Sequence, residues 1–378
     1  MRAKKILVYG GSFDPPHAGH VSLLKAALRS LRPDLSYVVP SYHAPLKPGA
    51  RAGARDRLSM ARLALGEPEI SGCRVKVSPF ESSRPRTTYT WQTLRHFRRL
   101  HPDAELYFLA GTDTLKSFGA WARPNEVLSL CRFLVGRRPG AHLSRAFPHA
   151  LWLPGLFPAV SSTGLRARLL ADKDVSGELT RRVLRHIRRR GLYGKALRRR
   201  LARELGPKRY RHCLAVCRMA LKLALRHGQD PEAAALAGLL HDYGRQIPRA
   251  RLAGLARAGC LAETARRKPR LLHGHAGSEL VRRRLGIRDP RVLSAIRKHV
   301  LGDGRMSALD RLVYTADACS ADRRFPEAEV IRRAALRRLD EGFLETVRTK
   351  LHYVLRDKDW MHPMGPRLWN AALEALQG

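Results

Sequence analysis

The sequence predicts two domains: an α/β domain with a doubly wound parallel sheet, followed by a domain made only of helices. Short apolar runs alternate with helical stretches in the first half, and several runs end at glycine or proline. From about residue 210 onward there is no convincing strand. The 378 residues, 44% of them hydrophobic, are enough for two separate cores.

The first half is expected to alternate strands and helices. The expected strands lie at residues 6–9, 37–39, 74–77, 106–109 and 132–135. The expected helices lie at residues 20–31, 57–65, 90–100 and 181–190. Such alternation predicts a parallel sheet with helices on both faces, and ligands bind these sheets at the carboxyl ends of the strands.

The pattern changes near residue 195, after a basic helix that Gly191 to Gly194 should stop. We therefore place the first domain at residues 1–195, a basic linker at 196–207 and the helical domain at 208–378. The helical domain contains long helical patterns at residues 212–227, 231–242, 277–285, 290–300, 307–319 and 327–355.

The net charge of +40 favours negatively charged partners such as nucleotides, nucleic acid or an anionic membrane. Arginine is spread through every helical stretch, however, and the basic-aromatic pattern of RNA-binding modules is absent, so we expect no specific nucleic-acid binding. The six cysteines form no CxxC pair, which fits reduced thiols. No apolar run approaches the roughly 20 residues of a membrane span, so we expect a cytoplasmic protein without a membrane partner.

Two segments of the first half are suited to binding phosphate. Gly10 to His20 follows the first expected strand, opens a helix and carries His17 and His20. Glycine lets a ligand approach the backbone, free N–H groups at a helix start attract phosphate, and the imidazoles can stabilise charge on it. Val160 to Arg166 combines hydroxyl side chains that can cap a helix with an arginine that can bind a triphosphate.

The string GGSFDPPHAGH at residues 10–20 resembles the signature of the HxGH nucleotidyltransferases, and within them it is most similar to bacterial nicotinate-nucleotide adenylyltransferase. VSSTGLR at residues 160–166 resembles that family's ISSTxIR, and residues 84–94 resemble RxGxSYTxxTL. The resemblance covers nearly all of residues 1–194. It implies a Rossmann-like fold and adenylyl transfer from ATP, with Mg²⁺ on the triphosphate, to nicotinate mononucleotide.

The resemblance also implies roles for single residues. His17, His20 and Arg166 should be catalytic. ATP should contact Gly11, Ser12, Phe13, His17, His20, Gly111, Asp113, Ser161, Ser162, Thr163 and Arg166. Nicotinate mononucleotide should contact Lys47, Thr88, Tyr89 and Trp121, with the indole stacked on the pyridine ring.

Two departures put the acceptor preference in question. The family usually has PPHK where this chain has Ala44 to Lys47, and Arg86 stands where glycine is usual. His43 is a nearby substitute for the missing histidine. Arg138-Pro139-Gly140 matches the family's RPG turn.

The helical half carries a constellation of imidazoles and carboxylates beside apolar helical residues. Both are ligands for Fe, Mn, Zn or Mg, and the apolar neighbours favour convergence inside a helical bundle. The predicted ligands are His212, His241, Asp242, His273, His299 and Asp317. Because six ligands exceed the need of one catalytic ion, we favour two divalent ions over one.

The order H…HD…H…H…D resembles the HD phosphohydrolases, and the strings AGLLHDYGRQIP and LLHGHAG are most similar to the symmetrical diadenosine tetraphosphate hydrolases. The resemblance implies that Asp242 is catalytic and that the substrate is cleaved into two ADP. Arg245 and Arg323 are candidates to hold its phosphates. Ser320 stands where glutamate is usual and Gln246 where aspartate is usual.

We therefore expect a bifunctional enzyme acting on ATP, nicotinate mononucleotide and diadenosine tetraphosphate. One alternative is an adenylyltransferase whose HD domain regulates it or acts on another substrate. Another acceptor, such as pantetheine phosphate, is a further alternative. A tRNA-acting or non-enzymatic basic protein is disfavoured, because the chain lacks the glycine-serine strand with paired acidic residues that tRNA-maturing nucleotidyltransferases use.

Overall fold

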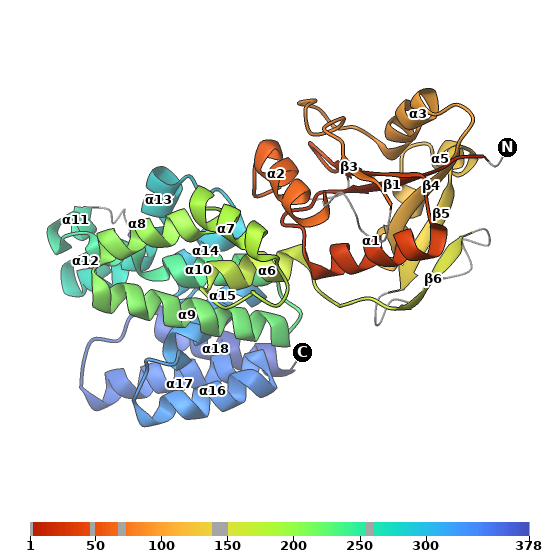
Figure 1. Cartoon of the computed structure of the whole chain (residues 1–378). Coiled ribbons are helices and arrows are strands. Elements are labelled where there is room, and N and C mark those ends of the chain that lie inside the picture. Colours follow the sequence, from red (N-terminus) through yellow and green to blue (C-terminus); the bar gives the residue numbers. More distant parts are fainter. Residues whose placement is uncertain (1–2, 46–49, 67–72, 138–149, 255–259, 378) are drawn as a thin grey trace. The chain divides into compact units, whose positions relative to one another are not determined.

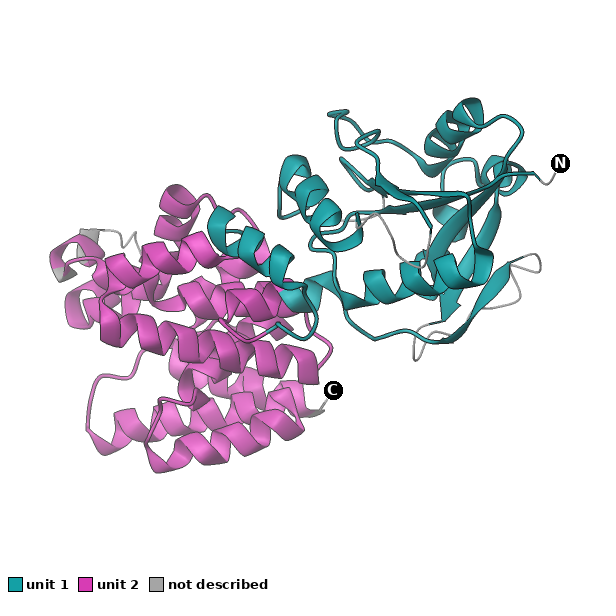
Figure 2. Ribbon diagram, in the orientation of Figure 1, with its two compact units in different colours: residues 1–165, 175–193 teal, residues 166–174, 194–378 magenta. Residues whose placement is uncertain are grey.

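The computed structural model describes residues 3–45, 50–66, 73–137, 150–254 and 260–377. The chain divides into two compact units, coloured separately in Figure 2. Unit 1 comprises residues 1–165 and 175–193, and unit 2 comprises residues 166–174 and 194–378. Lys47 and the turn at Arg138 to Gly140, both singled out in the sequence, lie outside the described residues.

Unit 1 is built around a six-stranded sheet in which every pair of neighbouring strands is parallel. Its strands are β1 (Lys5–Gly11), β2 (Leu35–Pro40), β3 (Val75–Val77), β4 (Glu105–Gly111), β5 (Arg132–Arg137) and β6 (Leu151–Leu156). Their order is β3-β2-β1-β4-β5-β6. The chain thus builds outward from β1 in one direction and then in the other, which confirms the doubly wound sheet.

Helices cover both faces of this sheet (Figure 1). The helices of unit 1 are α1 (Ala18–Leu31), α2 (Ala54–Leu65), α3 (Thr90–Leu100), α4 (Thr112–Leu115), η1 (Phe118–Ala120), α5 (Pro124–Leu130), the start of α6 (Ser162–Leu170) and α7 (Arg181–Arg190). On one face, Phe97 of α3 and Val127 of α5 share a buried hydrophobic cluster with Ile6 of β1. On the other, α1 comes so close that a Cβ at Gly136 of β5 would lie 2.2 Å from Leu23.

Strand β6 was not expected from the sequence. Its segment LWLPGL contains Pro154 and Gly155, which are typical of loops. The structure places β6 at the edge of the sheet, and its register with β5 is irregular near Arg137. An edge strand tolerates proline because its outer side needs no ladder hydrogen bond, which explains the missed strand.

Unit 2 contains helices and no strand within residues 194–254 and 260–377. After the end of α6 come α8 (Lys195–Leu205), α9 (Pro207–Arg226), α10 (Pro231–Leu240), η2 (His241–Gln246), α11 (Arg249–Gly254), α12 (Cys260–Arg267), η3 (Pro269–Leu272), α13 (His273–Leu285), α14 (Pro290–Lys298), α15 (Ala308–Cys319), α16 (Pro326–Arg337), α17 (Leu339–Arg356) and α18 (Met364–Gln377). The expected all-α second domain is confirmed.

Two details of unit 2 differ from the sequence expectations. Residues 196–205 of the expected linker form most of α8, and Pro207 begins α9. Leu201 of α8 is fully buried in the unit's core, and Leu197 and Leu205 pack against that core. The four-residue spacing of these leucines marks an amphipathic helix that the surrounding arginines disguise. The expected helix at 327–355 is two helices, α16 and α17, which pack on each other.

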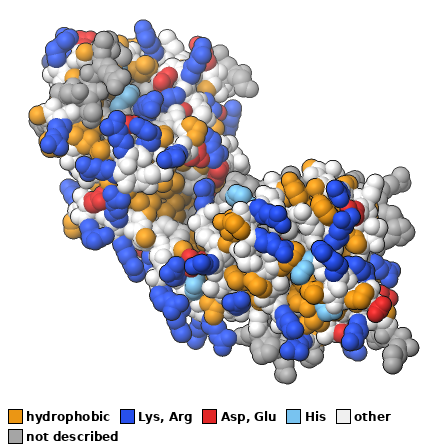
Figure 3. Space-filling model, turned by 90° about the horizontal axis from the view of Figure 1, so that it is seen from above, with side chains coloured by type: hydrophobic (Ala, Val, Ile, Leu, Met, Phe, Trp, Pro, Cys, Tyr) orange, Lys and Arg blue, Asp and Glu red, His pale blue; other side chains and the backbone are white. Residues whose placement is uncertain are grey.

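Lysine and arginine are spread over the face seen in Figure 3 rather than gathered in one patch. Within the described residues, no helix has the length and apolarity needed to cross a membrane. The five cysteines placed by the structure, Cys73, Cys131, Cys213, Cys217 and Cys319, are buried and carry free thiols.

Glu81 is a buried carboxyl group of unit 1 whose ionisation opposes folding. It is 7% exposed, and the Thr93 hydroxyl donates a hydrogen bond to its Oε1 at 2.6 Å. Burial raises the pKa of Glu81 to about 7 from 4.5, against the opposing effect of Thr93. Because the folded pKa is the higher one, this group favours folding fully below pH 4.5 and loses that effect as the pH rises through 7.

We predict that Glu81→Gln reduces this pH sensitivity. The amide keeps an acceptor for Thr93 but does not ionise. The free energies of unfolding of the two proteins should therefore converge near pH 4.5, and the variant should gain up to about 3 kcal/mol relative to wild type by pH 8. Calorimetric unfolding at several pH values measures the difference, and a difference independent of pH would contradict the prediction.

Candidate active sites

The first candidate site lies where the strand order of unit 1 reverses. β1 and β4 are neighbours in the sheet, and the chain leaves them toward opposite sides. The loop after β1, which begins at Gly11, and the turn after β4, at Gly111, therefore share one edge of the sheet. Open α/β sheets bind ligands at this position.

His17 and His20 come together in the loop after β1 and the first turn of α1. Their ring centroids lie 3.8 Å apart, and the backbone N–H of His17 donates to Nδ1 of His20 at 3.2 Å. The ring of Phe13 packs edge-on against His20, with 5.1 Å between centroids. Phe13 adopts a positive φ of 48°, which turns the chain sharply before the helix. The structure thus places the two predicted catalytic imidazoles side by side.

A buried arginine that sequence analysis missed holds the loops around this edge. Arg57 of α2 is 1% exposed and donates to four backbone carbonyls, those of Ser12, Ser41, Tyr42 and Ala52. Asp14 acts in the same way as an acceptor: its carboxylate receives the backbone N–H groups of Arg51 and Ala52 and the Tyr193 hydroxyl. Carbonyls from loops after β1 and β2 are thereby tied to one side chain.

The predicted phosphate-binding helix start is present at α6. The Ser161 hydroxyl accepts the N–H of Gly164 at 3.0 Å, and the Ser162 hydroxyl donates to the carbonyl of Pro15 at 3.0 Å. Ser161 and Thr163 are exposed. Arg166 is placed differently from the expectation, because its guanidinium makes a two-point salt bridge to Glu232 of α10, at 3.0 and 2.7 Å.

The predicted acceptor residues form two groups. Thr88 is buried, and Tyr89 is exposed at the start of α3. A parallel β-bridge joins Thr87 to His43, so the segment after β2 lies beside the start of α3. Trp121 is partly buried, and its ring packs against Phe118, Phe108 and Phe133 with centroids 5.2 to 6.4 Å apart. Asp113, which was predicted to contact ATP rather than the acceptor, is exposed in the first turn of α4.

The second candidate site lies inside unit 2, where all six predicted metal ligands converge. Two groups of them have ligand atoms within 4.8 Å of one another: His212, His241 and Asp317, and His241, Asp242 and His299. His273 joins the second group, with Nε2 3.1 Å from Oδ1 of Asp242 and 3.1 Å from Nε2 of His299.

Backbone carbonyls orient three of these histidines. Nδ1 of His241 faces the carbonyl of Gly238 at 2.8 Å, and His273 and His299 face the carbonyls of Arg270 and Ile296 at 2.6 and 2.7 Å. A carbonyl can only accept, so each Nδ1 must carry the proton. In a neutral ring Nε2 is then an acceptor that points toward the cluster.

The electrostatics of the cluster keep three rings neutral, those of His241, His273 and His299, and keep the carboxyl groups charged. His212 differs: burial lowers its pKa, but Asp317 and Asp322 outweigh burial and raise that pKa overall. Burial lowers the pKa of His241 to about 4 and also lowers the pKa values of His273 and His299. Burial alone would raise the pKa of Asp242, but the electrostatic effect of the surrounding histidines and of Arg245 holds that pKa below its usual range. Asp317 behaves alike, because the favourable effect of His212 outweighs burial.

This arrangement fits a divalent ion. Two neutral acceptor nitrogens, Nε2 of His273 and Nε2 of His299, lie 3.1 Å apart, and their lone pairs repel unless a cation or proton lies between them. Asp242 supplies a carboxylate oxygen to the same place. Imidazole and carboxylate together suit Fe, Mn or Zn, and Mg less well, because Mg prefers oxygen ligands.

Comparison with known proteins matches both halves of the chain. The pattern of the cytidylyltransferase-like family matches residues 8–168, and that of the HD domain matches residues 209–322. A Mycoplasma pneumoniae protein named "Probable nicotinate-nucleotide adenylyltransferase/Ap4A hydrolase" is 30% identical over 317 residues, covering 82% of this chain and 87% of its own length. The chain belongs to the family of fused proteins named nicotinate-nucleotide adenylyltransferase/Ap4A hydrolase.

Relatives of the separate halves are also found. A Chlorobaculum parvum protein named "Probable nicotinate-nucleotide adenylyltransferase" is 35% identical over 190 residues, 49% of this chain and 97% of its own. A Clostridium acetobutylicum crystal structure, titled as a predicted HD superfamily hydrolase involved in NAD metabolism, is 30% identical with a TM-score of 0.45, covering 48% of this chain and 96% of that chain.

Asp322 is a further residue of the HD site that sequence analysis missed. Its Oδ2 lies 2.7 Å from Nδ1 of His212, so it does for His212 what the carbonyls do for the other histidines. The hydroxyl of Ser320 donates to its other oxygen at 2.6 Å. The residue that replaces the usual glutamate of HD hydrolases thus supports a carboxylate two positions later. The only signal in the sequence is an acidic residue in the turn after the helix of Asp317.

We predict that Asp322→Asn weakens metal binding without unfolding the protein. An asparagine can still accept from His212 but lacks the charge that raises the basicity of the imidazole. Removing such a partner typically lowers metal affinity about 10- to 100-fold. Competition titrations of Mn²⁺ and Zn²⁺ against a chelator measure the affinity, with Asp303→Asn, which changes a half-exposed side chain outside the ligand set, as control. Equal affinities for Asp322→Asn and wild type would refute this role.

Proposed function

We propose that the chain is a bifunctional enzyme. Unit 1 transfers the adenylyl group of ATP to nicotinate mononucleotide, giving deamido-NAD and pyrophosphate, and unit 2 hydrolyses diadenosine tetraphosphate (Ap4A) symmetrically to two ADP. The convergence of six metal-ligand candidates in unit 2, together with paired His17 and His20 at the sheet edge of unit 1, carries this proposal. We propose that the protein acts in the cytoplasm, where both nucleotide substrates are available.

Adenylyl transfer in unit 1 needs positioning and charge neutralisation rather than a nucleophilic side chain. The phosphate of the mononucleotide attacks the α-phosphorus of Mg²⁺-bound ATP, and pyrophosphate leaves. His17 and His20 donate to the phosphate oxygens on which charge develops. The hydroxyl groups and free N–H groups at the start of α6 bind the triphosphate. Arg166 can join them only when its salt bridge to Glu232 opens.

In unit 2, a divalent ion held by the cluster would supply an activated water for attack on a phosphorus of the tetraphosphate. The chain's own contribution is to hold the donors in place. The carbonyls and Asp322 fix which nitrogen of each histidine faces inward. Arg245 and Arg323, which pair with Asp242 and Asp317, are near enough to the cluster to neutralise the phosphates.

We predict that His17→Ala and His20→Ala each reduce adenylyl transfer by about 100- to 1000-fold, because each removes a donor to the reacting phosphate. The rate is measured by chromatography of deamido-NAD formed from ATP and nicotinate mononucleotide. His101→Ala is the control and should retain activity, because His101 follows the C-terminal end of α3, whereas the predicted acceptor residues lie at its start. The amide analogue of the acceptor should react far more slowly if Thr88 and Tyr89 bind the nicotinate carboxylate, as we propose.

Turnover near the wild-type rate in both His17→Ala and His20→Ala would rule out this site for adenylyl transfer. Equal efficiency on nicotinate mononucleotide and its amide would leave the transfer chemistry intact but contradict the acceptor. Preference for pantetheine phosphate would replace the acceptor outright.

We predict that Asp242→Ala abolishes Ap4A hydrolysis and lowers bound metal, yet leaves adenylyl transfer at the wild-type rate. The carboxylate is the group that faces His273, His299 and Arg245, so its loss opens the cluster while unit 1 keeps its own site. Metal analysis and chromatography of ADP test both effects. If wild-type protein carries stoichiometric metal but cleaves no Ap4A, the alternative of a regulatory or differently specific HD domain applies.

A further inference from the structure

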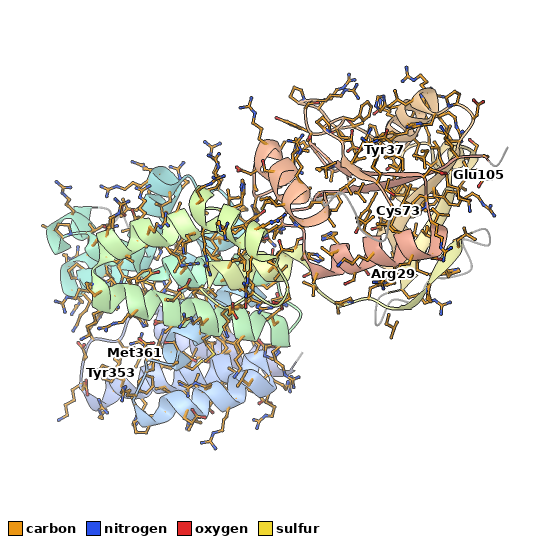
Figure 4. The ribbon with its side chains drawn as sticks, viewed as in Figure 1. Arg29, Tyr37, Cys73, Glu105, Tyr353 and Met361 are labelled. Atoms are coloured by element: carbon orange, nitrogen blue, oxygen red, sulfur yellow. The ribbon has the colours of Figure 1, made fainter. Side chains whose placement is uncertain are left out.

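A cavity of about 770 Å³ opens beside the metal-ligand cluster of unit 2. His299 and Asp317 line one part of it, and Tyr353 and Met361 of the C-terminal segment line another. Figure 4 labels Tyr353 and Met361 in that segment. Pockets that hold small ligands measure about 300–1,000 Å³. A molecule bound here therefore has one part next to the cluster and another among the largely apolar residues of the C-terminal segment.

Five lysine or arginine side chains line this cavity, and four of them are paired with carboxylates. The pairs are Arg245 with Asp242, Lys268 with Asp359, Arg323 with Asp317, and Arg356 with Asp357. The fifth, Lys350, makes no ion pair with any carboxylate that the structure describes. It is thus the cavity's one described lysine or arginine that contacts no carboxylate directly, although the charge of Asp317 acts on it from a greater distance.

Lys350 is held in place by groups that carry no net charge. Its Nζ lies 3.5 Å from the ring centroid of Tyr314 and 3.4 Å from the backbone carbonyl oxygen of His299. The aromatic face and the carbonyl orient the ammonium group but do not neutralise it. Because that carbonyl belongs to a metal-ligand candidate, the unpaired charge lies at the border between the cluster and the open cavity.

We propose that Lys350 binds the phosphate chain of the nucleotide substrate and makes the cavity selective for polyphosphates. The proposal rests on the proposed hydrolysis by unit 2. An ammonium group inside a cavity is stable when an anion joins it, and an ammonium has three N–H donors to offer. A phosphate chain bound by Lys350 passes directly beside Asp317 and His299, which leaves the apolar part of the cavity, with Leu351 and Leu368, for the nucleoside.

The test uses the full-length, metal-loaded protein with ADP and Ap4A as probes. Lys350→Met keeps the stem but removes the charge, Lys350→Gln also keeps a donor for the His299 carbonyl, and Lys350→Arg keeps the charge. Lys358→Met, which removes an exposed lysine just beyond α17 and outside the cavity, is the matched control. Titration calorimetry gives the Kd for ADP, kinetics gives kcat and KM for Ap4A, and metal content and melting are recorded for each variant.

The uncharged variants should raise the Kd for ADP and the KM for Ap4A about 10- to 100-fold, with a smaller effect on kcat. Lys350→Arg should stay within a few-fold of wild type, and Lys358→Met should match it. The KM of wild type should rise with salt more steeply than that of Lys350→Met. If Lys350→Met does not fold, Lys350→Gln and Lys350→Arg provide the comparison.

Unchanged affinity for ADP and unchanged KM in folded, metal-loaded Lys350→Met or Lys350→Gln would overturn the role of Lys350 while leaving the proposed hydrolysis intact. Binding of ADP that depends on Lys350, in a wild type that cleaves no Ap4A, would support Lys350 and refute the hydrolysis. Equal losses in Lys350→Gln and Lys350→Arg would show that the lysine acts through packing rather than charge, and would also overturn the proposal.

Discussion

The second site depends on backbone carbonyls left over at the ends of helical segments. His241, His273 and His299 each follow directly after such a segment: α10, η3 and α14. Each donates from Nδ1 to the carbonyl three residues earlier. The last carbonyls of a helix lack partners within it, so a histidine at this position satisfies one of them and simultaneously fixes its own proton. Three helix ends thereby aim three acceptor nitrogens at one point.

In unit 1, the side chain of one cation, Arg57, binds backbone carbonyls that lack partners in the sheet. The loops after parallel strands leave backbone carbonyls near the ligand edge, where the sheet no longer satisfies them. Arg57 collects four of these carbonyls, and its burial is offset by bonds from every nitrogen of the guanidinium. The loop that leads to His17 is therefore fixed from β2 and α2 as well as from β1. Burial lowers the pKa of Arg57, and the nearby Asp14 opposes that effect.

The sequence predicted the elements whose pattern is local and missed those that depend on tertiary position. Short apolar runs, several of them ended by glycine or proline, predicted five of the six strands, while β6 was hidden by Pro154. The leucines of α8 were masked by arginines, because a charge run resembles a linker until its apolar spacing is counted. The six metal-ligand candidates were found because imidazoles at the ends of apolar helices are visible in the chain itself.

Residues that act by orienting others left little trace in the sequence. Asp322 and Arg57 are ordinary charged residues in a chain with 72 lysines and arginines, and only three-dimensional contacts distinguish them. Arg166 shows the converse, since its motif predicts ATP while its guanidinium is held by Glu232. A sequence motif identifies a side chain that can bind a ligand. The partner of that side chain in the absence of ligand depends on the charges around it, which the motif does not contain.

The pairing of carboxylates with arginines has a consequence for the order of binding in unit 2. Oδ1 of Asp242 contacts a nitrogen of His273 and the guanidinium of Arg245. Oδ1 of Asp317 likewise contacts a nitrogen of His212 and the guanidinium of Arg323. A divalent ion that takes these oxygens competes with the guanidinium groups, because one carboxylate oxygen cannot fully serve both cations. Arg245 and Arg323 are then free to meet phosphate. We therefore expect metal and polyphosphate to favour each other's binding, whereas Lys350, which contacts no described carboxylate directly, would need no such exchange.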